Sequence, residues 1–230
     1  MQPGTTSSLG PIFLKIPKEL REKIYTLALP EGKWTIGDAA VSDSNDLNFA
    51  RGIGDLSGSS FPLSSVAVLR VNRQIRQEAL PLAYRRTRFC FDDIDDLVKL
   101  LIAIGDVGRS NIESVELAWQ SRSDSELQWA EAPIPVPDEH SLTLPTLHVA
   151  ECMQLLKQCK RLRFLRLYFE RELILGLSAA ACVADPGIRE LCSIRGIERV
   201  EIWDLGHEPV EECGFVKWVE EAMASTGSVS

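Results

Sequence analysis

Residues 162–169 have the sequence LRFLRLYF, and the fold class follows from the pattern in this segment. Leu162, Leu165 and Leu167 form the pattern Leu-x-x-Leu-x-Leu, in which an apolar anchor precedes an alternating run. Alternation of apolar and other residues is typical of a β-strand. Two further copies and one weaker copy occur along the chain, at Ile112-x-x-Val115-x-Leu117, Ile197-x-x-Val200-x-Ile202 and Tyr84-x-x-Thr87-x-Phe89.

A predicted helix precedes each of the three stronger copies, over residues 94–104, 146–159 and 186–194. Consecutive helix–strand units place the strands in parallel, with the helices on one side of the sheet. The repeated form resembles the core of leucine-rich repeats, although the copies are 28, 50 and 35 residues apart and lack the usual asparagine. We therefore expect an α/β fold, a short irregular stack with a parallel sheet, capped by a helix over 215–223.

Two helices are predicted ahead of this stack. Residues 12–29, IFLKIPKELREKIYTLAL, form the first helix after Pro17, with Leu20, Ile24 and Leu27 on one face. The second helix covers 65–83, and Pro81 should kink or restart it. Because so short a helix is not stable alone, the apolar face of the first one must dock on the rest of the chain or on another protein.

The first helix resembles an F-box, and the two segments together resemble the F-box-like proteins of filamentous fungi. The F-box pattern, Leu-Pro-x-Glu-Leu followed by Ile, matches Ile16, Pro17, Glu19, Leu20 and Ile24. The fungal pattern continues with a second motif, here RQIRQEALPLAY at 73–84. The resemblance covers about the first ninety residues of the chain.

The resemblance implies a protein–protein interaction adaptor, the substrate-recognition subunit of a cullin-type ubiquitin ligase. Its first helix would bind the linker subunit of the ligase, and the α/β stack would bind an unknown target protein. The residues that it implies for linker binding are Ile16, Pro17, Leu20, Ile24 and Leu27.

A self-contained structural or interaction protein, which does not bind the ligase, is the alternative hypothesis. The second helix would then cover the apolar face of the first, and Arg21 would pair with a carboxylate such as Glu78. The exposure of Leu20 and Ile24 in the isolated chain distinguishes the two, since an adaptor should present them as a contiguous apolar patch.

The domain organisation predicted from composition has four parts. Residues 1–11 and 224–230 are expected to be disordered tails. Residues 12–86 form the F-box-like helical segment, interrupted by a loop insertion at 31–64 that is rich in Gly, Ser and Asp. Residues 87–223 form the repeat-like α/β domain, with a proline-rich loop at 120–145.

A net charge of −8 argues against general binding to nucleic acids or anionic membranes. One local basic patch departs from this balance and could take an anion, an acidic partner or, as a third hypothesis, nucleic acid. Pairing with nearby carboxylates, including Asp92 to Asp96, is the structural alternative. The residues of this predicted patch are Arg70, Arg73, Arg76, Arg85, Arg86 and Arg88.

No pattern of catalytic or metal-binding residues is found, so we predict no enzymatic activity, no cofactor and no metal site. His140, His148 and His207 lack a neighbouring nucleophile motif. The acidic run after residue 91 is explained by helix capping. The six cysteines include no C-x-x-C pair and suggest reduced, mostly buried thiols in an intracellular protein, cytoplasmic or nuclear. No segment resembles a signal peptide or a membrane span.

Overall fold

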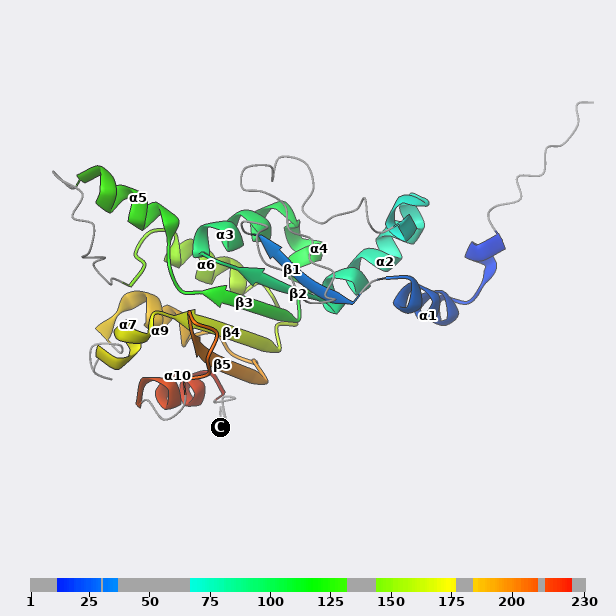
Figure 1. The fold of residues 1–230 in the computed structure, drawn as a ribbon. Helices are drawn as coiled ribbons and strands as arrows, with labels where there is room; N and C mark the ends of the chain where they lie inside the picture. The colour runs from blue at the N-terminus through cyan, green and yellow to red at the C-terminus, as the bar shows by residue number, and fades with distance from the viewer. Residues whose placement is uncertain are drawn as a thin grey trace, which may run out of the picture.

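The computed structural model describes residues 12–29, 31–36, 67–131, 144–176, 184–210 and 214–224. Its centre is a five-stranded, fully parallel sheet in which the strands follow their order along the chain (Figure 1). This is the α/β architecture that the repeated pattern predicts. The strands are β1 (Gly32–Ile36), β2 (Thr87–Phe91), β3 (Ser114–Ala118), β4 (Phe164–Phe169) and β5 (Arg199–Asp204).

The helices of the stack cross between successive strands. Among them, α3, α6 and α9 pack in a row, and α3 contacts β2 and β3. Helix α10 packs against β5 at the end of the sheet, as expected for a terminal cap. The helices are α3 (Ile94–Ala103), α4 (Gly105–Arg109), α5 (Arg122–Glu131), α6 (Val149–Leu156), α7 (Arg171–Gly176), α9 (Pro186–Leu191) and α10 (Gly214–Ala224).

The N-terminal segment lies at the opposite end of the molecule. It consists of the 3-10 turn η1 (Ile12–Lys15), helix α1 (Lys18–Ala28), the 3-10 turn η2 (Ala67–Arg70) and helix α2 (Arg73–Arg86). Figure 1 shows α1 beyond α2, away from the sheet, and α1 packs against α2. The Asn72 side chain caps α2 by accepting a hydrogen bond from the backbone N–H of Ile75 at 2.8 Å.

The three stronger copies of the repeat are in register in the sheet. Val115, Leu165 and Val200 are paired neighbours across β3, β4 and β5. The second apolar position follows the same order, as Leu117, Leu167 and Ile202. The anchors that precede the strands are buried too, at Ile112, Leu162 and Ile197. The pattern therefore marks equivalent positions of successive helix–strand units.

The weaker copy is offset by two residues from the alignment that the sequence suggested. Phe89, not Thr87, is paired with Val115. Phe89 and Phe91 are both buried and face the same core layer as the apolar positions of the later strands. The Thr87 hydroxyl instead donates to the carbonyl of Ala83 at 2.8 Å, at the end of α2.

Two segments predicted as loops contain regular structure. Residues 32–36, placed in the insertion at 31–64, form the edge strand β1, because β2 supplies a backbone ladder that local composition does not reveal. Residues 122–131, placed in the loop at 120–145, form α5, where Ser121 Oγ accepts from the N–H of Asp124 at 3.2 Å. The other residues of these two predicted loops are mostly outside the described ranges, and so are the predicted tails, apart from residue 224.

Helix α2 also differs from its prediction over 65–83. The regular helix starts eight residues later, after η2, and continues through Pro81 to Arg86 without the predicted restart. A proline removes one helical hydrogen bond, and the packing of Ala79, Ala83 and Tyr84 into the core holds both sides of that position.

Candidate interaction surfaces

The first candidate surface is built on α1, which a polar clamp holds against α2. Arg21 Nε donates to Glu78 Oε2 at 2.8 Å, and Arg21 Nη2 donates to Glu78 Oε1 at 2.7 Å. The Tyr25 hydroxyl donates to Glu78 Oε2 at 2.8 Å. The pairing of Arg21 with Glu78 that the sequence suggested is therefore confirmed. Such a bidentate pair fixes orientation as well as distance.

The clamp changes the proton affinities of its members. The hydrogen bonds from Arg21 lower the pKa of Glu78 from 4.5 to about 2, helped by donation from Gln74 and Tyr25. Burial, followed by the hydrogen bond to Glu78, raises the pKa of Tyr25 to about 12. Glu78 is thus a carboxylate, and Tyr25 a neutral phenol, throughout the neutral range.

The face of α1 that carries Arg21 and Tyr25 is bound to α2, and the apolar stripe of α1 is left exposed to solvent. Arg21, Tyr25 and Leu29 are buried, whereas Leu20 is 48% exposed, Ile24 41% and Leu27 88%. The expectation that the second helix covers the apolar stripe is therefore wrong. Helix α2 faces the Arg21 side of α1, since Glu78 binds there. The exposed stripe along α1, with half-buried Ile16 at its start, consists of Ile16, Pro17, Leu20, Ile24 and Leu27.

The clamp should make the docking of α1 sensitive to acid. The pKa of Glu78 is lowered in the folded state, so its contribution to stability is present above pH 4.5 and is lost as the pH falls toward about 2. We expect the difference in free energy of unfolding between the wild type and Glu78→Gln to shrink over that interval. Urea titrations at several pH values measure it.

Glu22→Gln, on the same helix, is the control for this titration. Glu22 pairs with Lys18 at 3.6 Å on the exposed side of α1, so its loss should change stability by less than about 0.5 kcal/mol at every pH. A Glu78→Gln effect that stays constant from neutral pH to the acid limit would contradict the proposed role of the clamp.

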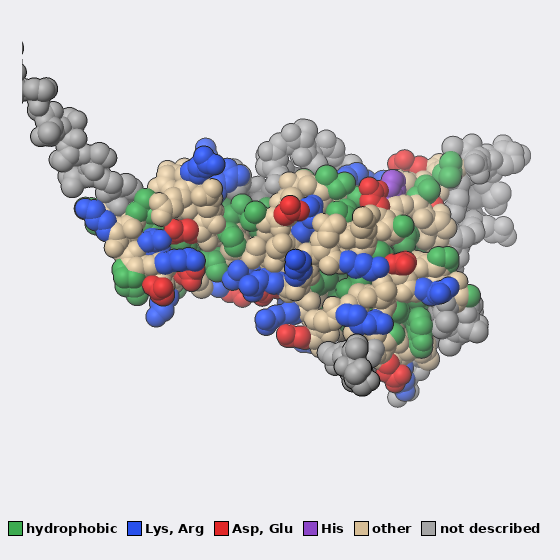
Figure 2. All heavy atoms as spheres, turned by 180° about the vertical axis from the view of Figure 1, so that it is seen from behind, with side chains coloured by type: hydrophobic (Ala, Val, Ile, Leu, Met, Phe, Trp, Pro, Cys, Tyr) green, Lys and Arg blue, Asp and Glu red, His purple; other side chains and the backbone are tan. Residues whose placement is uncertain are grey.

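The predicted arginine patch does not form one surface. Arg85 donates to Asn111 Oδ1, and Arg86 pairs with Glu31 at 2.8 Å. Arg88 lies on the sheet, while Arg70, Arg73 and Arg76 are exposed on η2 and α2. Seen from behind, lysines and arginines are spread along the molecule between acidic and apolar side chains (Figure 2). Arg88 therefore lies on a different element from the other five arginines, and Arg85 and Arg86 bind partners within the chain, while the nucleic-acid hypothesis stays a prediction.

The second candidate surface is the face of the sheet opposite the apolar repeat positions, which we term the open face. Strand alternation places on it the residues between the core positions of each strand. Arg88 and Arg199 are exposed, and Phe164 and Trp203 are half-buried. The open face comprises Lys33, Arg88, Cys90, Ser114, Glu116, Phe164, Arg166, Tyr168, Arg199, Glu201 and Trp203.

A buried carboxylate organises the centre of the open face. Glu116 is 1% exposed and pairs with Lys33 at 3.1 Å, Arg88 at 3.3 Å and Arg166 at 3.2 Å. The Tyr168 hydroxyl donates to Glu116 Oε2 at 3.0 Å. Burial alone would raise the pKa of Glu116, but Lys33, Arg166 and Tyr168 together lower it. Glu116 is therefore a fully ionised anchor beneath cationic side chains.

Guanidinium groups lie over two aromatic rings of the open face, Phe164 and Trp203. The Arg88, Arg166 and Arg199 guanidinium carbons lie 5.4, 5.5 and 5.7 Å from the centroid of the Phe164 ring. Arg166 also lies 4.1 Å from the Trp203 ring and pairs with Glu201 at 2.7 Å. These are cation–π distances, so the rings hold the arginine side chains in place.

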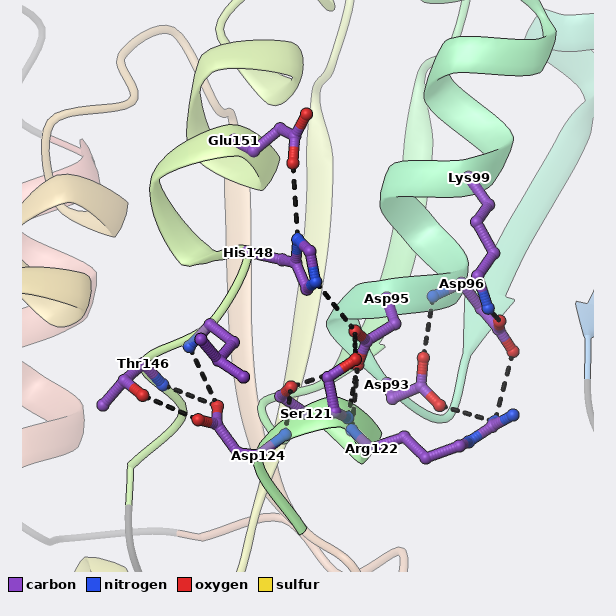
Figure 3. Close-up of polar contacts among 12 residues, drawn as sticks. Asp93, Asp95, Asp96, Lys99, Ser121, Arg122, Asp124, Thr146, His148 and Glu151 are labelled. Atoms are coloured by element: carbon purple, nitrogen blue, oxygen red, sulfur yellow. Dashed lines mark hydrogen bonds and ion pairs between the residues drawn. The ribbon is translucent and has the colours of Figure 1, made fainter. Parts of the chain in front are cut away.

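The acidic run after β2 forms a different cluster, at the carboxyl ends of β2 and β3 (Figure 3). Asp93 caps α3 by accepting from the N–H of Asp96 at 2.7 Å. Arg122 pairs with Asp93 at 2.6 Å and with Asp96 at 3.4 Å. Asp95 accepts from Ser123 Oγ at 2.6 Å. The cluster caps α3 and ties the start of α5 to it, which confirms the capping interpretation.

The histidines do not complete a catalytic arrangement in the described part of the chain. His148 Nε2 lies 3.8 Å from Asp95, and its Nδ1 lies 3.4 Å from Glu151, so the imidazole sits between two carboxylates (Figure 3). Ser123 bonds directly to Asp95, without the intervening histidine that a nucleophile needs. His207 packs its ring edge-on against Tyr168 at 5.2 Å. His140 lies outside the described residues.

The cysteines in the described ranges are buried free thiols. Burial raises the pKa of Cys192 to about 11 and that of Cys159 to about 12, and it raises the pKa of Cys90 and Cys152 further. Within those ranges, no three His, Cys, Asp or Glu side chains gather in a way that could hold a metal ion. In the same part of the chain, no helix combines the length and apolar character needed to cross a membrane.

The sequence carries a pattern that corresponds to the open face, although catalytic and metal-binding motifs do not reveal it. Glu116, Arg166 and Glu201 occupy the same x position, between the last two apolar residues of each repeat. They are paired neighbours across β3, β4 and β5. An alternation of charge sign at one repeat position predicts a cross-strand ladder once the strands are known to be in register.

Comparison of the chain with protein-family models, with curated proteins and with solved structures finds no match. A function must therefore be inferred from the chemistry of these surfaces, together with the F-box-like resemblance of the sequence.

Proposed function

We propose that this chain is an intracellular protein–protein interaction adaptor without catalytic activity. Its α1 stripe docks on the linker subunit of a cullin-type ubiquitin ligase, and its α/β stack binds a target protein. The observation that carries the proposal is the orientation of α1. Leu20, Ile24 and Leu27 are exposed on a helix whose other face is clamped to α2.

Physical reasons support a partner for this stripe. A run of exposed apolar residues at helical spacing is the arrangement used for helix-in-groove recognition. The stripe occupies the positions that match the F-box pattern, Pro17, Leu20 and Ile24 among them. The clamp presents it in a fixed orientation, because Arg21 and Tyr25 both bind Glu78, and a preordered helix loses less entropy on binding.

The alternative is a free-standing interaction protein that does not bind the ligase. One observation favours it, since Arg21 is bound within the chain to Glu78, as that hypothesis expected. The exposure of Leu20 and Ile24 is contrary to its other expectation. We therefore place the adaptor first.

Co-purification with the linker subunit tests the proposal. The wild type should form a stoichiometric complex, and Leu20→Asp/Ile24→Asp should weaken it at least about 100-fold, because two carboxylates would enter an apolar interface. Both side chains are exposed in the free chain, so the variant should keep the wild-type urea midpoint.

Ile102→Asp/Val107→Asp is the matched control. Ile102 is 57% exposed and Val107 51%, and they lie on α3 and α4, so this variant should bind like the wild type. Absence of a complex with a well-folded wild type would refute the adaptor proposal and leave the alternative.

A further inference from the structure

One transverse row of the open face runs across all five strands. The register pairs Lys33 with Arg88, Arg88 with Ser114, Ser114 with Phe164, and Phe164 with Arg199. Strands lie about 4.8 Å apart, so the row is about 19 Å long. An extended polypeptide rises about 3.3 Å per residue, so about six residues laid across the strands would span it.

The charge that the open face presents to solvent is positive. The open face carries four cations, Lys33, Arg88, Arg166 and Arg199, against two carboxylates. The carboxylates are the inner layer, since Glu116 and Glu201 have side chains only 1% and 14% exposed. The Arg88 and Arg199 side chains pair with Glu116 and Glu201 beneath them but are still 50% and 72% exposed. A partner would therefore meet guanidinium groups first, although the chain as a whole has a net charge of −8.

Phe164 in this row, and Trp203 elsewhere on the open face, are not free to stack on bases. Single-stranded nucleic acids bind by laying bases on open aromatic faces. Here Arg88, Arg166 and Arg199 gather around Phe164, and Arg166 lies over Trp203. A partner that binds hydrogen-bond donors and positive charge, without stacking on aromatic rings, fits this surface better than a single-stranded nucleic acid.

We propose that the open face binds an extended, acidic polypeptide segment of about six residues, whose carboxylates bind Arg88 and Arg199. Carboxylates accept strong, charge-assisted hydrogen bonds from guanidinium groups. The cation–π contacts with Phe164 restrict both arginine side chains beforehand, which lowers the entropy lost on binding. The inference rests on the proposed function in one respect, since it treats the sheet as the part that binds the target. It adds the chemical class of that target, an acidic polypeptide.

Fluorescence anisotropy with a labelled eight-residue glutamate peptide tests the inference on the full chain, at about 0.15 M ionic strength, where charges more than about 8 Å apart are largely screened. The wild type should bind it, and Arg88→Gln/Arg199→Gln should weaken binding at least about tenfold through the loss of two charge-assisted contacts. Arg73→Gln/Arg76→Gln is the control. It removes the same charge from α2, outside the open face, and should change affinity less than about twofold.

Three results would overturn the inference. They are no binding by the folded wild type, equal weakening by the α2 variant, and equally tight binding of an oligothymidylate with the same number of charges. If the double variant does not fold, Arg199→Gln alone, at the more exposed position, should still weaken binding about threefold. The linker subunit is absent from the peptide assay. A lack of peptide binding therefore refutes this inference without refuting the adaptor proposal, which the co-purification tests.

Discussion

Replacing Glu116 by alanine is expected to lower the free energy of unfolding by about 2–4 kcal/mol, because it breaks a buried cluster of ion pairs. Glu116 is the common partner of Lys33, Arg88 and Arg166. Without it, Glu201 is the one carboxylate that the structure still pairs with Arg166 among the described residues, in a site where the Arg166 side chain is 16% exposed. The value lies toward the lower part of the range for broken buried pairs, because Arg88 and Lys33 can turn to water.

Urea unfolding measures this effect, and two further variants serve as controls. Glu116→Gln keeps the side-chain volume and separates the loss of charge from the loss of packing. Glu198→Ala breaks an exposed pair with Arg163 at 3.5 Å and should change stability by less than about 0.5 kcal/mol. If Glu116→Ala and Glu198→Ala unfold at the same urea concentration, Glu116 does not organise the open face.

Leu165→Ala is expected to destabilise the fold by about 3–5 kcal/mol, the range for a fully buried leucine that leaves a cavity. Leu165 has no exposed surface and lies between Val115 and Val200 in the centre of the sheet. The helices behind it are part of the same core cluster, so the cavity cannot collapse easily.

Leu175→Ala provides the comparison, because Leu175 is 67% exposed on α7 and its loss should cost less than about 0.5 kcal/mol. Denaturant unfolding followed by tryptophan fluorescence, to which buried Trp119 contributes, gives both values. A loss below about 1 kcal/mol for Leu165→Ala would mean that the repeat position is not an essential part of the core.

The repeated pattern is the feature of the sequence that predicted the structure best. The three strong copies of the Leu-x-x-Leu-x-Leu form predicted a parallel sheet, and they occupy equivalent, paired positions in it. The cap at Asp93 and the buried side of α3 could also be predicted from the sequence, because both depend on residues within one or two turns of helix.

Other elements depend on partners that are distant in the chain. Strand β1 lies in a stretch whose composition resembles a loop, and β2, whose paired residues come 55 positions later, supplies its hydrogen bonds. The arginines at 70–88 form one patch in the sequence, but the turn from α2 into β2 sends Arg88 to the sheet and leaves Arg73 on the helix. Side-chain direction, rather than proximity in sequence, separates them.

The sequence alone determined that the chain folds into a parallel helix–strand stack, since periodicity and repeat spacing are local properties that the backbone must satisfy. It also showed that α1 has an apolar face and that Arg21 and Glu78 could pair. Only the tertiary structure decided which face of α1 is buried. Arg21 and Tyr25 reach Glu78 across 57 and 53 residues of chain, and this bidentate contact turns Leu20, Ile24 and Leu27 toward solvent. The sequence of a helix specifies which residues share each of its faces, but the neighbouring elements of the fold decide which face is buried.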